Sequence, residues 1–243
     1  MIQIKDTIFK QPFFFISFSL LNSENAEVQF QTLFSNESGS LKHYLENEMI
    51  GLRHLGWNLP RYVQYSVLLD SLEYKDESRR VKVIENGHII IQGAVSESFL
   101  CWASSATISH TNGDRIQINT TALVEFTYNC VTLLKRAAED SLNLVTIDCK
   151  FGFIGLDSNY VLSSTKLSGN NLHYIDKKLE AIKTETEASI SINISKLLDN
   201  ESDSRITYEI LAKIMRMFGY TEESISYTYG TEKKIDIELI KNL

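Results

Sequence analysis

The chain has 243 residues, of which 43% are hydrophobic and 23% are charged, so it can bury a core and is not expected to be disordered throughout. Its formal charge of −7, from 24 basic and 31 acidic residues, disfavours a dedicated nucleic-acid-binding protein, because such proteins usually carry a basic domain. The apolar run 12–21 is far shorter than the ~20 residues of a membrane-spanning helix, and no other run is comparable. These features predict a soluble, cytoplasmic protein without a membrane partner.

The N-terminal region is predicted to form two strands, over residues 12–22 and 26–35, joined by a short polar turn. The first apolar run also has the length of the core of a secretory signal peptide, but Asp6 interrupts the basic region before it and no A-x-A motif follows. A buried strand is therefore the better interpretation. The cysteines have no CxxC spacing and are interpreted as reduced, buried thiols; they are Cys101, Cys130 and Cys149.

Two helices are expected next. The first is capped by Ser40 and runs to about His54. The second follows Pro60, which suits a first helical turn, and runs from Arg61 to about Tyr74. A strand is the alternative for the second segment, because periodicity alone does not decide a short run rich in β-branched residues.

The centre of the chain combines two hairpin signals with the longest amphipathic helix signal. The pairs Asn86-Gly87 and Asn112-Gly113 favour tight turns and predict an antiparallel meander over about 80–119. Asn119, Thr120 and Thr121 offer a helix cap, after which apolar residues follow at helical spacing from Leu123 to Ala137. The expected inner face of this helix consists of Leu123, Phe126, Cys130, Leu133 and Ala137.

The remainder alternates between the two kinds of element. The expected elements are one or two strands over 144–156, a helix over 172–182, a strand over 188–194, a helix from its cap Ser204 to Phe218 with a stop at Gly219, and a hairpin over 224–239. Because 163–171 resembles a linker, we predict domains 1–163 and 172–243, with a single domain as the alternative. The fold class is α+β, with mostly antiparallel hairpins packed against four to five amphipathic helices.

The motifs of the well-marked enzyme classes do not occur in the chain. It contains no GxGxxG, GxxxxGK[ST], HExxH or GxSxG, so no cofactor and no metal is predicted. The most enzyme-like fragment is Asp148-Cys149-Lys150, because an acid and a lysine two residues apart on a strand share one face. Metal-dependent nucleases use such a step together with an earlier carboxylate, for which Asp114 or Glu125 could serve. A plain cross-strand ion pair is the competing interpretation.

The densest basic spot lies at the start of the first hairpin. Arg79, Arg80 and Lys82 are candidates for phosphate contact, although the acidic residues just before them favour local neutralisation. The basic residues of the later helix are interpreted as an ordinary solvated face; they are Arg205, Lys213 and Arg216.

The predicted C-terminal hairpin is the favoured contact surface, because an edge strand with alternating aromatics suits a protein partner. A core-facing role for these aromatics is the alternative. The interface candidates are Ile225, Tyr227, Tyr229, Ile235 and Ile237. We therefore expect a non-catalytic protein that contacts another protein or a second copy of itself, as a subunit or adaptor of an assembly. The alternatives are a nuclease or related hydrolase centred on Asp148 and Lys150, and a nucleic-acid-binding module that uses Arg79, Arg80 and Lys82.

Overall fold

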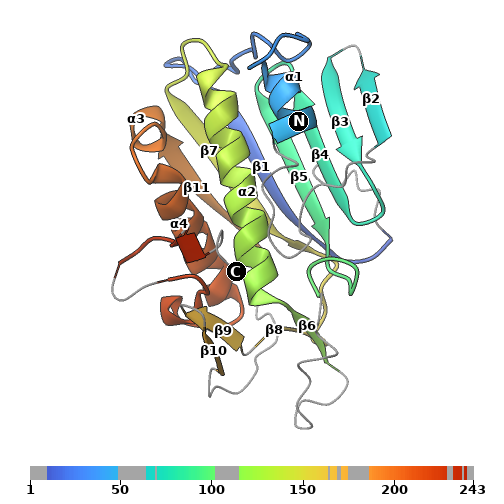
Figure 1. Cartoon of the computed structure of the whole chain (residues 1–243), viewed down its shortest axis with the longest axis vertical. Helices are drawn as coiled ribbons and strands as arrows, with labels where there is room; N and C mark the ends of the chain where they lie inside the picture. The colour runs from blue at the N-terminus through green and yellow to red at the C-terminus, as the bar shows by residue number, and fades with distance from the viewer. Residues whose placement is uncertain are drawn as a thin grey trace.

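A seven-stranded antiparallel sheet forms the centre of the molecule (Figure 1). The computed structural model describes residues 10–48, 64–68, 70–101, 115–163, 165–168, 171–174, 186–228, 232–236 and 238–239. The strand order is β11 (Glu187–Asn193), β7 (Thr146–Ile154), β1 (Phe13–Leu21), β5 (His88–Ala94), β4 (Arg79–Ile84), β3 (Ser71–Lys75) and β2 (Gln64–Leu68). Strands β2 to β5 follow one another as a meander, whereas β1 lies between β5 and β7.

The first residues of strand β1 are apolar on both faces because both faces are buried there. Side chains alternate along a strand, so Phe14 and Ile16 point to the face that carries the helices, where they belong to the main core. Phe13 and Phe15 point to the opposite face and form a second, small cluster with Ala94. This explains why the segment is nearly continuous in hydrophobic residues instead of alternating with polar ones.

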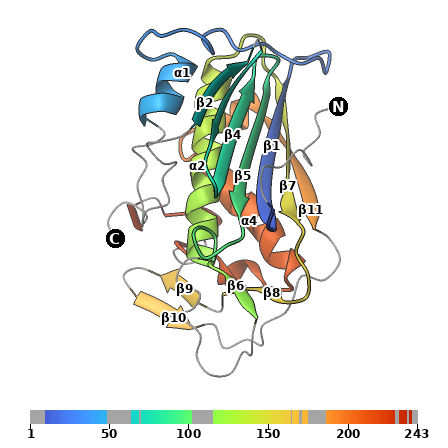
Figure 2. The ribbon, with the colours of Figure 1, turned by 90° about the vertical axis from the view of Figure 1, so that its right-hand side faces the viewer.

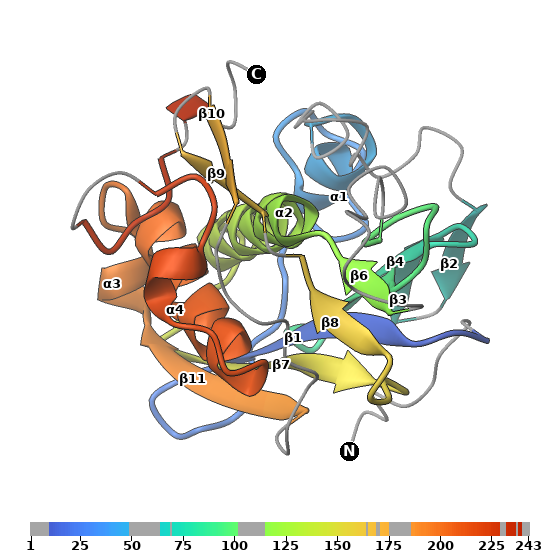
Figure 3. The same cartoon turned by 90° about the horizontal axis from the view of Figure 1, so that it is seen from below.

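The helices cover one face of the sheet (Figures 2 and 3). Helix α2 (Thr120–Glu139) runs along the sheet, and Asn119 caps it by accepting hydrogen bonds from the amides of Thr121 and Ala122. Helix α4 (Ser202–Met217) packs beside α2 and follows the short helix α3 (Ile194–Leu197). Helix α1 (Leu41–His43) is capped by Ser40, as predicted, and continues into a π-helical turn, Tyr44–Glu48. The predicted α+β class with a mostly antiparallel sheet is confirmed.

Two small sheets complete the described fold. Strand β6 (Ile116–Ile118) pairs with β8 (Tyr160–Leu162) in the one parallel pairing among the described strands. Strand β9 (Thr165–Ser168) pairs with β10 (Asn171–Tyr174). The predicted second unit contributes β11 to the same sheet as the strands of the first, and the division into two domains stays a prediction.

The Asn86-Gly87 hairpin is confirmed, with a three-residue loop between Ile84 and His88. Gly87 has φ +81°, and a Cβ atom there would lie 2.4 Å from the carbonyl oxygen of Val28. Glycine is therefore required both by the turn and by the close approach of the preceding loop. The other pair, Asn112-Gly113, lies outside the described residues.

Several predicted elements are wrong. Residues 26–35 form only two isolated bridges. The helix expected over 61–74 is replaced by β2, where a strand was the alternative, and by β3, which was not predicted. Strand β10 begins the segment that was expected to be a helix over 172–182. The described residues of 222–236 contain a 3₁₀ turn, Glu222–Ser224, and no strand, so no hairpin forms within them. None of the helices in the described ranges is long and apolar enough to cross a membrane.

Candidate functional site: a basic groove along helix α4

Helix α4 has one apolar and one charged face. The buried side chains that face the core include Ile206, Ile210 and Ile214. The other face carries side chains at intervals of three or four residues, which places them in one stripe along the helix. This stripe consists of Arg205, Tyr208, Glu209, Ala212, Lys213 and Arg216.

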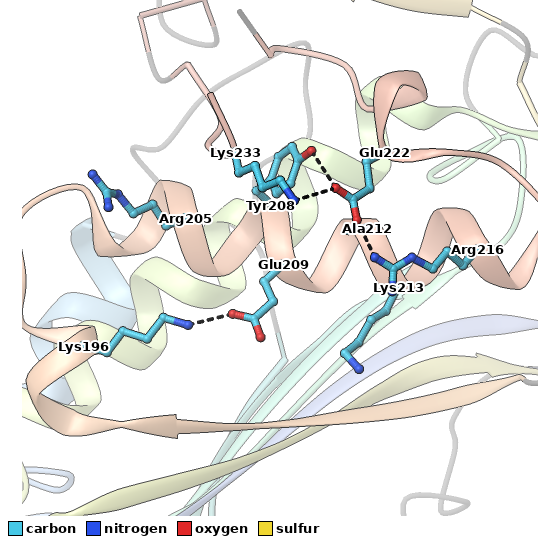
Figure 4. A pocket seen from close by; sticks show the side chains of 9 residues that line it. All are labelled: Lys196, Arg205, Tyr208, Glu209, Ala212, Lys213, Arg216, Glu222 and Lys233. Atoms are coloured by element: carbon cyan, nitrogen blue, oxygen red, sulfur yellow. Dashed lines mark hydrogen bonds and ion pairs between the residues drawn. The ribbon is translucent and has the colours of Figure 1, made fainter. Parts of the chain in front are cut away.

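The stripe forms the floor of an open groove with a volume of about 390 Å³ (Figure 4). Lys196 of α3 borders the groove at one end, and Glu222 and Lys233 from the segment after α4 border it at the other. Ala212 lies between the larger side chains and leaves the space open. Gly219, at φ +75°, follows the helix and turns the chain so that Glu222 borders the groove beside Arg216.

The lining of the groove has more cations than carboxylates although the chain as a whole is acidic. Its lining has five cations and two carboxylates; the cations are Lys196, Arg205, Lys213, Arg216 and Lys233. Glu209 pairs with Lys196 at 2.7 Å, and Arg205 pairs with Glu201 outside the groove at 3.5 Å. Lys213 has no ion pair within the described residues. The lining therefore presents a surplus of positive charge that is available to an anion.

Glu222 is held by two hydrogen bonds and one ion pair. Arg216 donates to Oε1, the hydroxyl of Tyr208 donates to Oε2 at 3.2 Å, and Nζ of Lys233 lies 3.6 Å from Oε2. The hydrogen bond from Arg216 is the main reason that the pKa of Glu222 lies below its usual value. Burial, followed by the charge of Glu222, raises the pKa of Tyr208, which keeps its hydroxyl protonated as a donor.

Asp148 and Lys150 share one exposed face of β7, as predicted. That face is opposite to the helix layer, since Ile147, Cys149 and Phe151 point into the main core. Their cross-strand neighbours are serines, Ser19 and Ser17 on β1 and Ser191 and Ser189 on β11. The sheet therefore presents a polar strip here rather than a cluster of carboxylates.

A hydrogen-bonded chain of serine, histidine and glutamate crosses the same face. The hydroxyl of Ser19 lies 3.0 Å from Nδ1 of His88, and Nε2 of His88 lies 2.5 Å from Oε1 of Glu27. Such chains activate serine nucleophiles when amides near the serine can hold an oxyanion. Ser19, however, lies inside a central strand, whose amides are used in pairing with β5 and β7. We infer that this series of hydrogen bonds is structural and fixes Glu27 to the tip of the β4–β5 hairpin.

The proposed nuclease carboxylates are not brought together. Glu125 is buried on α2 and accepts a hydrogen bond from Tyr227 at 2.5 Å, on the helix side of the sheet, whereas Asp148 is on the other side. Asp114 lies outside the described residues. Within the described part of the chain, no three side chains of His, Cys, Asp or Glu gather as metal ligands would.

The two arginines among the predicted phosphate contacts form ion pairs with residues of β3 and of the turn between β3 and β4. Arg79 pairs with Asp76 at 3.0 Å and lies over the ring of Phe99, and Arg80 donates to Glu73 at 2.6 Å. Burial opposes ionisation of Glu73, but Arg80 and Lys75 together hold its pKa below the usual value. Lys82 is half-buried on the same strand. Local neutralisation is therefore the observed arrangement for the two arginines.

The predicted interface residues are in the core where they are described. Ile225, Tyr227 and Ile235 are buried and belong to the main hydrophobic cluster. Tyr227 has φ 59°, which is incompatible with a regular strand. Tyr229 and Ile237 lie outside the described residues.

Comparisons with protein-family models, with curated proteins and with solved structures found no match to the chain. The site therefore rests on its geometry. Sequence reasoning identified three of its cations on α4 but interpreted them as a solvated face. The interval of three or four residues between Arg205, Tyr208, Ala212 and Arg216 was the available signal. The residues that close the groove come from other segments and carry no such periodicity.

Proposed function

We propose that this chain is a non-catalytic cytoplasmic protein that acts by contact with another protein, and that the groove along α4 binds an acidic segment of that partner. The observation that carries the proposal is the surplus of cations in the groove. Because the chain has a net charge of −7, this positive surface does not follow from a basic composition. The three free, buried cysteines suit the reducing conditions of a cytoplasm.

The length of the groove favours an extended ligand. Arg205 and Arg216 lie about 16 Å apart along α4, at 1.5 Å of rise per residue. An extended chain covers that distance with about five residues, at ~3.3 Å each. Several acidic side chains of one short segment can therefore reach cations along the groove at the same time, which a single small anion cannot do.

The alternative functions have less support. The nuclease hypothesis needs a carboxylate near Asp148, and Glu125 lies on the other side of the sheet. The nucleic-acid hypothesis needs Arg79 and Arg80 for contacts with phosphates, and both guanidinium groups already form ion pairs with carboxylates of the same protein.

Fluorescence anisotropy with a short, labelled oligoglutamate peptide tests the proposal. We expect the wild type to bind the peptide, with an affinity that falls as salt concentration rises because exposed charges are screened. Lys213→Glu should weaken binding about tenfold, equivalent to ~1.4 kcal/mol, because it replaces attraction with repulsion in the lining of the groove.

Lys150→Glu is the matched control, because Lys150 is an exposed lysine on the opposite face of the sheet and its replacement should leave the affinity unchanged. Equal affinities of the two variants would refute the groove as the site. Tighter binding of a single-stranded oligonucleotide than of the peptide, lost in Lys213→Glu, would replace the protein partner with nucleic acid.

A further inference from the structure

The end of the groove near Arg216 is arranged around a single anion. A guanidinium, an ammonium and a phenolic hydroxyl converge on the carboxylate of Glu222 (Figure 4). The donors come from two segments, since Tyr208 and Arg216 belong to α4 and Lys233 lies after Glu222 in the chain. Elsewhere in the groove, Lys196 pairs with Glu209 alone. The Glu222 position therefore differs from the rest of the groove in the number of donors that it gathers.

We propose that this position is a phosphate subsite that binds a phosphoserine within the acidic segment of the partner; this inference rests on the proposed function. Glu222 occupies the subsite in the unbound protein, and the phosphate of the ligand displaces it. The ligand class is thus a phosphate monoester flanked by carboxylates.

The donor set suits a phosphate better than a carboxylate. A phosphoserine carries about −1.5 to −2 charges and three acceptor oxygens at neutral pH, whereas Glu222 offers one charge and two oxygens. Arginine can donate two parallel hydrogen bonds to two of the phosphate oxygens, and lysine and tyrosine can donate to the third oxygen or to the remaining lone pairs of the first two. All three donors can therefore be used at once by a single phosphate group.

Glu222 can leave without disrupting the fold. The side chains of its cationic partners are 62% exposed for Arg216 and 76% exposed for Lys233. Ion pairs between exposed side chains contribute little to stability, so exchanging one anion for another costs little. Glu222 itself belongs to a short turn on the surface, at the edge of the groove.

Three labelled peptides with the same glutamate-rich sequence, and with serine, glutamate or phosphoserine at the centre, test the proposal by fluorescence anisotropy. We expect the wild type to bind the phosphopeptide about tenfold more tightly than the serine peptide, and the glutamate peptide to lie between them. Arg216→Gln and Tyr208→Phe should bring the ratio of the phosphopeptide and serine-peptide affinities towards one. Glu222→Gln should raise the affinity for the phosphopeptide several-fold, because the competing carboxylate is removed.

Arg205→Gln, at the other end of the groove, is the matched control. It should weaken all three peptides to a similar extent and leave the ratio of their affinities unchanged. Equal wild-type affinities for the three peptides would overturn the phosphate subsite and leave the acid-binding groove intact. Absence of binding by any of the peptides would instead overturn the proposed function, and the subsite with it.

Discussion

Glu125 and Tyr227 form a buried polar pair in the core. The side chain of Glu125 on α2 accepts a hydrogen bond from the hydroxyl of Tyr227, which lies 102 residues later in the chain. Burial raises the pKa of Glu125 to about 8, so its carboxyl group is mostly protonated at neutral pH. The sequence suggested a metal ligand at one position and a surface aromatic at the other. Neither role could be corrected from the sequence, because the contact exists only in the folded chain.

The raised pKa predicts that stability falls as pH rises. The folded state holds the proton of Glu125 up to about pH 8, whereas the unfolded state releases it near the ordinary value of 4.5. The contribution of this group is therefore fully present below about pH 4.5 and is lost as pH rises through about 8. In Glu125→Gln the side chain cannot ionise, and the amide oxygen can still accept the hydrogen bond from Tyr227.

We expect Glu125→Gln to be more stable than the wild type at pH 9 by at least ~1.4 kcal/mol, the free energy of one pKa unit, and to lose this advantage at pH 5. Urea denaturation at pH 5, 7 and 9 measures the difference. A constant difference between the two proteins at all three pH values would contradict the pKa assignment.

At the scale of the element, α2 shows what a sequence can predict. Its cap, its length and its apolar face were all recognised, because a long helix repeats one pattern many times. The ring of Phe126 lies edge-on to Phe14 and Phe99, with centroid distances of 6.0 and 5.3 Å. Phe126 thus joins the central strand β1 to the segment after β5.

Phe126→Ala should lower the free energy of unfolding by ~3–5 kcal/mol, because it empties a site that is only 4% exposed. Asn129→Ala, on the same helix and half-buried, should cost less than ~1 kcal/mol. Chemical denaturation of both variants provides the measurement. A loss below ~1 kcal/mol for Phe126→Ala would show that the ring does not pack as described.

Short elements were harder to predict, for physical reasons. A few β-branched and aromatic residues between 61 and 74 fit both periodicities, and the choice of strand was made by pairing with β4. Around Tyr227, alternating apolar residues suggested a strand, but these side chains pack into the core from a turn. An alternation of apolar and polar residues over four or five positions does not show whether the apolar side chains lie on a strand or pack into the core from a turn.

At the scale of the whole molecule, the segment after α4 is part of the core. Tyr220, Ile225, Tyr227 and Ile235 are all buried in it. Burial of each large apolar side chain contributes about 1.5–3 kcal/mol, so the four together contribute about 6–12 kcal/mol, comparable with the 5–15 kcal/mol net stability of a typical domain.

Truncation after Gly219 should therefore abolish cooperative unfolding instead of removing only a binding surface. Thermal unfolding followed by near-ultraviolet circular dichroism would show this as the loss of the transition. Lys233→Ala, in the same segment, should unfold like the wild type because its side chain is 76% exposed. A truncated chain with a wild-type transition would mean that the segment is not needed for the fold.

The groove could be predicted only in part from the sequence, because its lining comes from segments that are separate in the chain. The stripe on α4 was visible, whereas Lys196, Glu222 and Lys233 reach it from other segments. Their arrangement depends on the turn at Gly219 and on the packing of the last described segments, which no local pattern encodes.

The central position of β1 has a consequence for the synthesis of the chain. This strand leaves the ribosome well before β7, because Ser17 pairs with Lys150, which is made 133 residues later. At about 5–20 residues per second, the strand waits on the order of ten seconds for β7. During that interval its phenylalanines have no finished sheet to enter, and transiently exposed apolar strands of this kind make a nascent chain prone to aggregation.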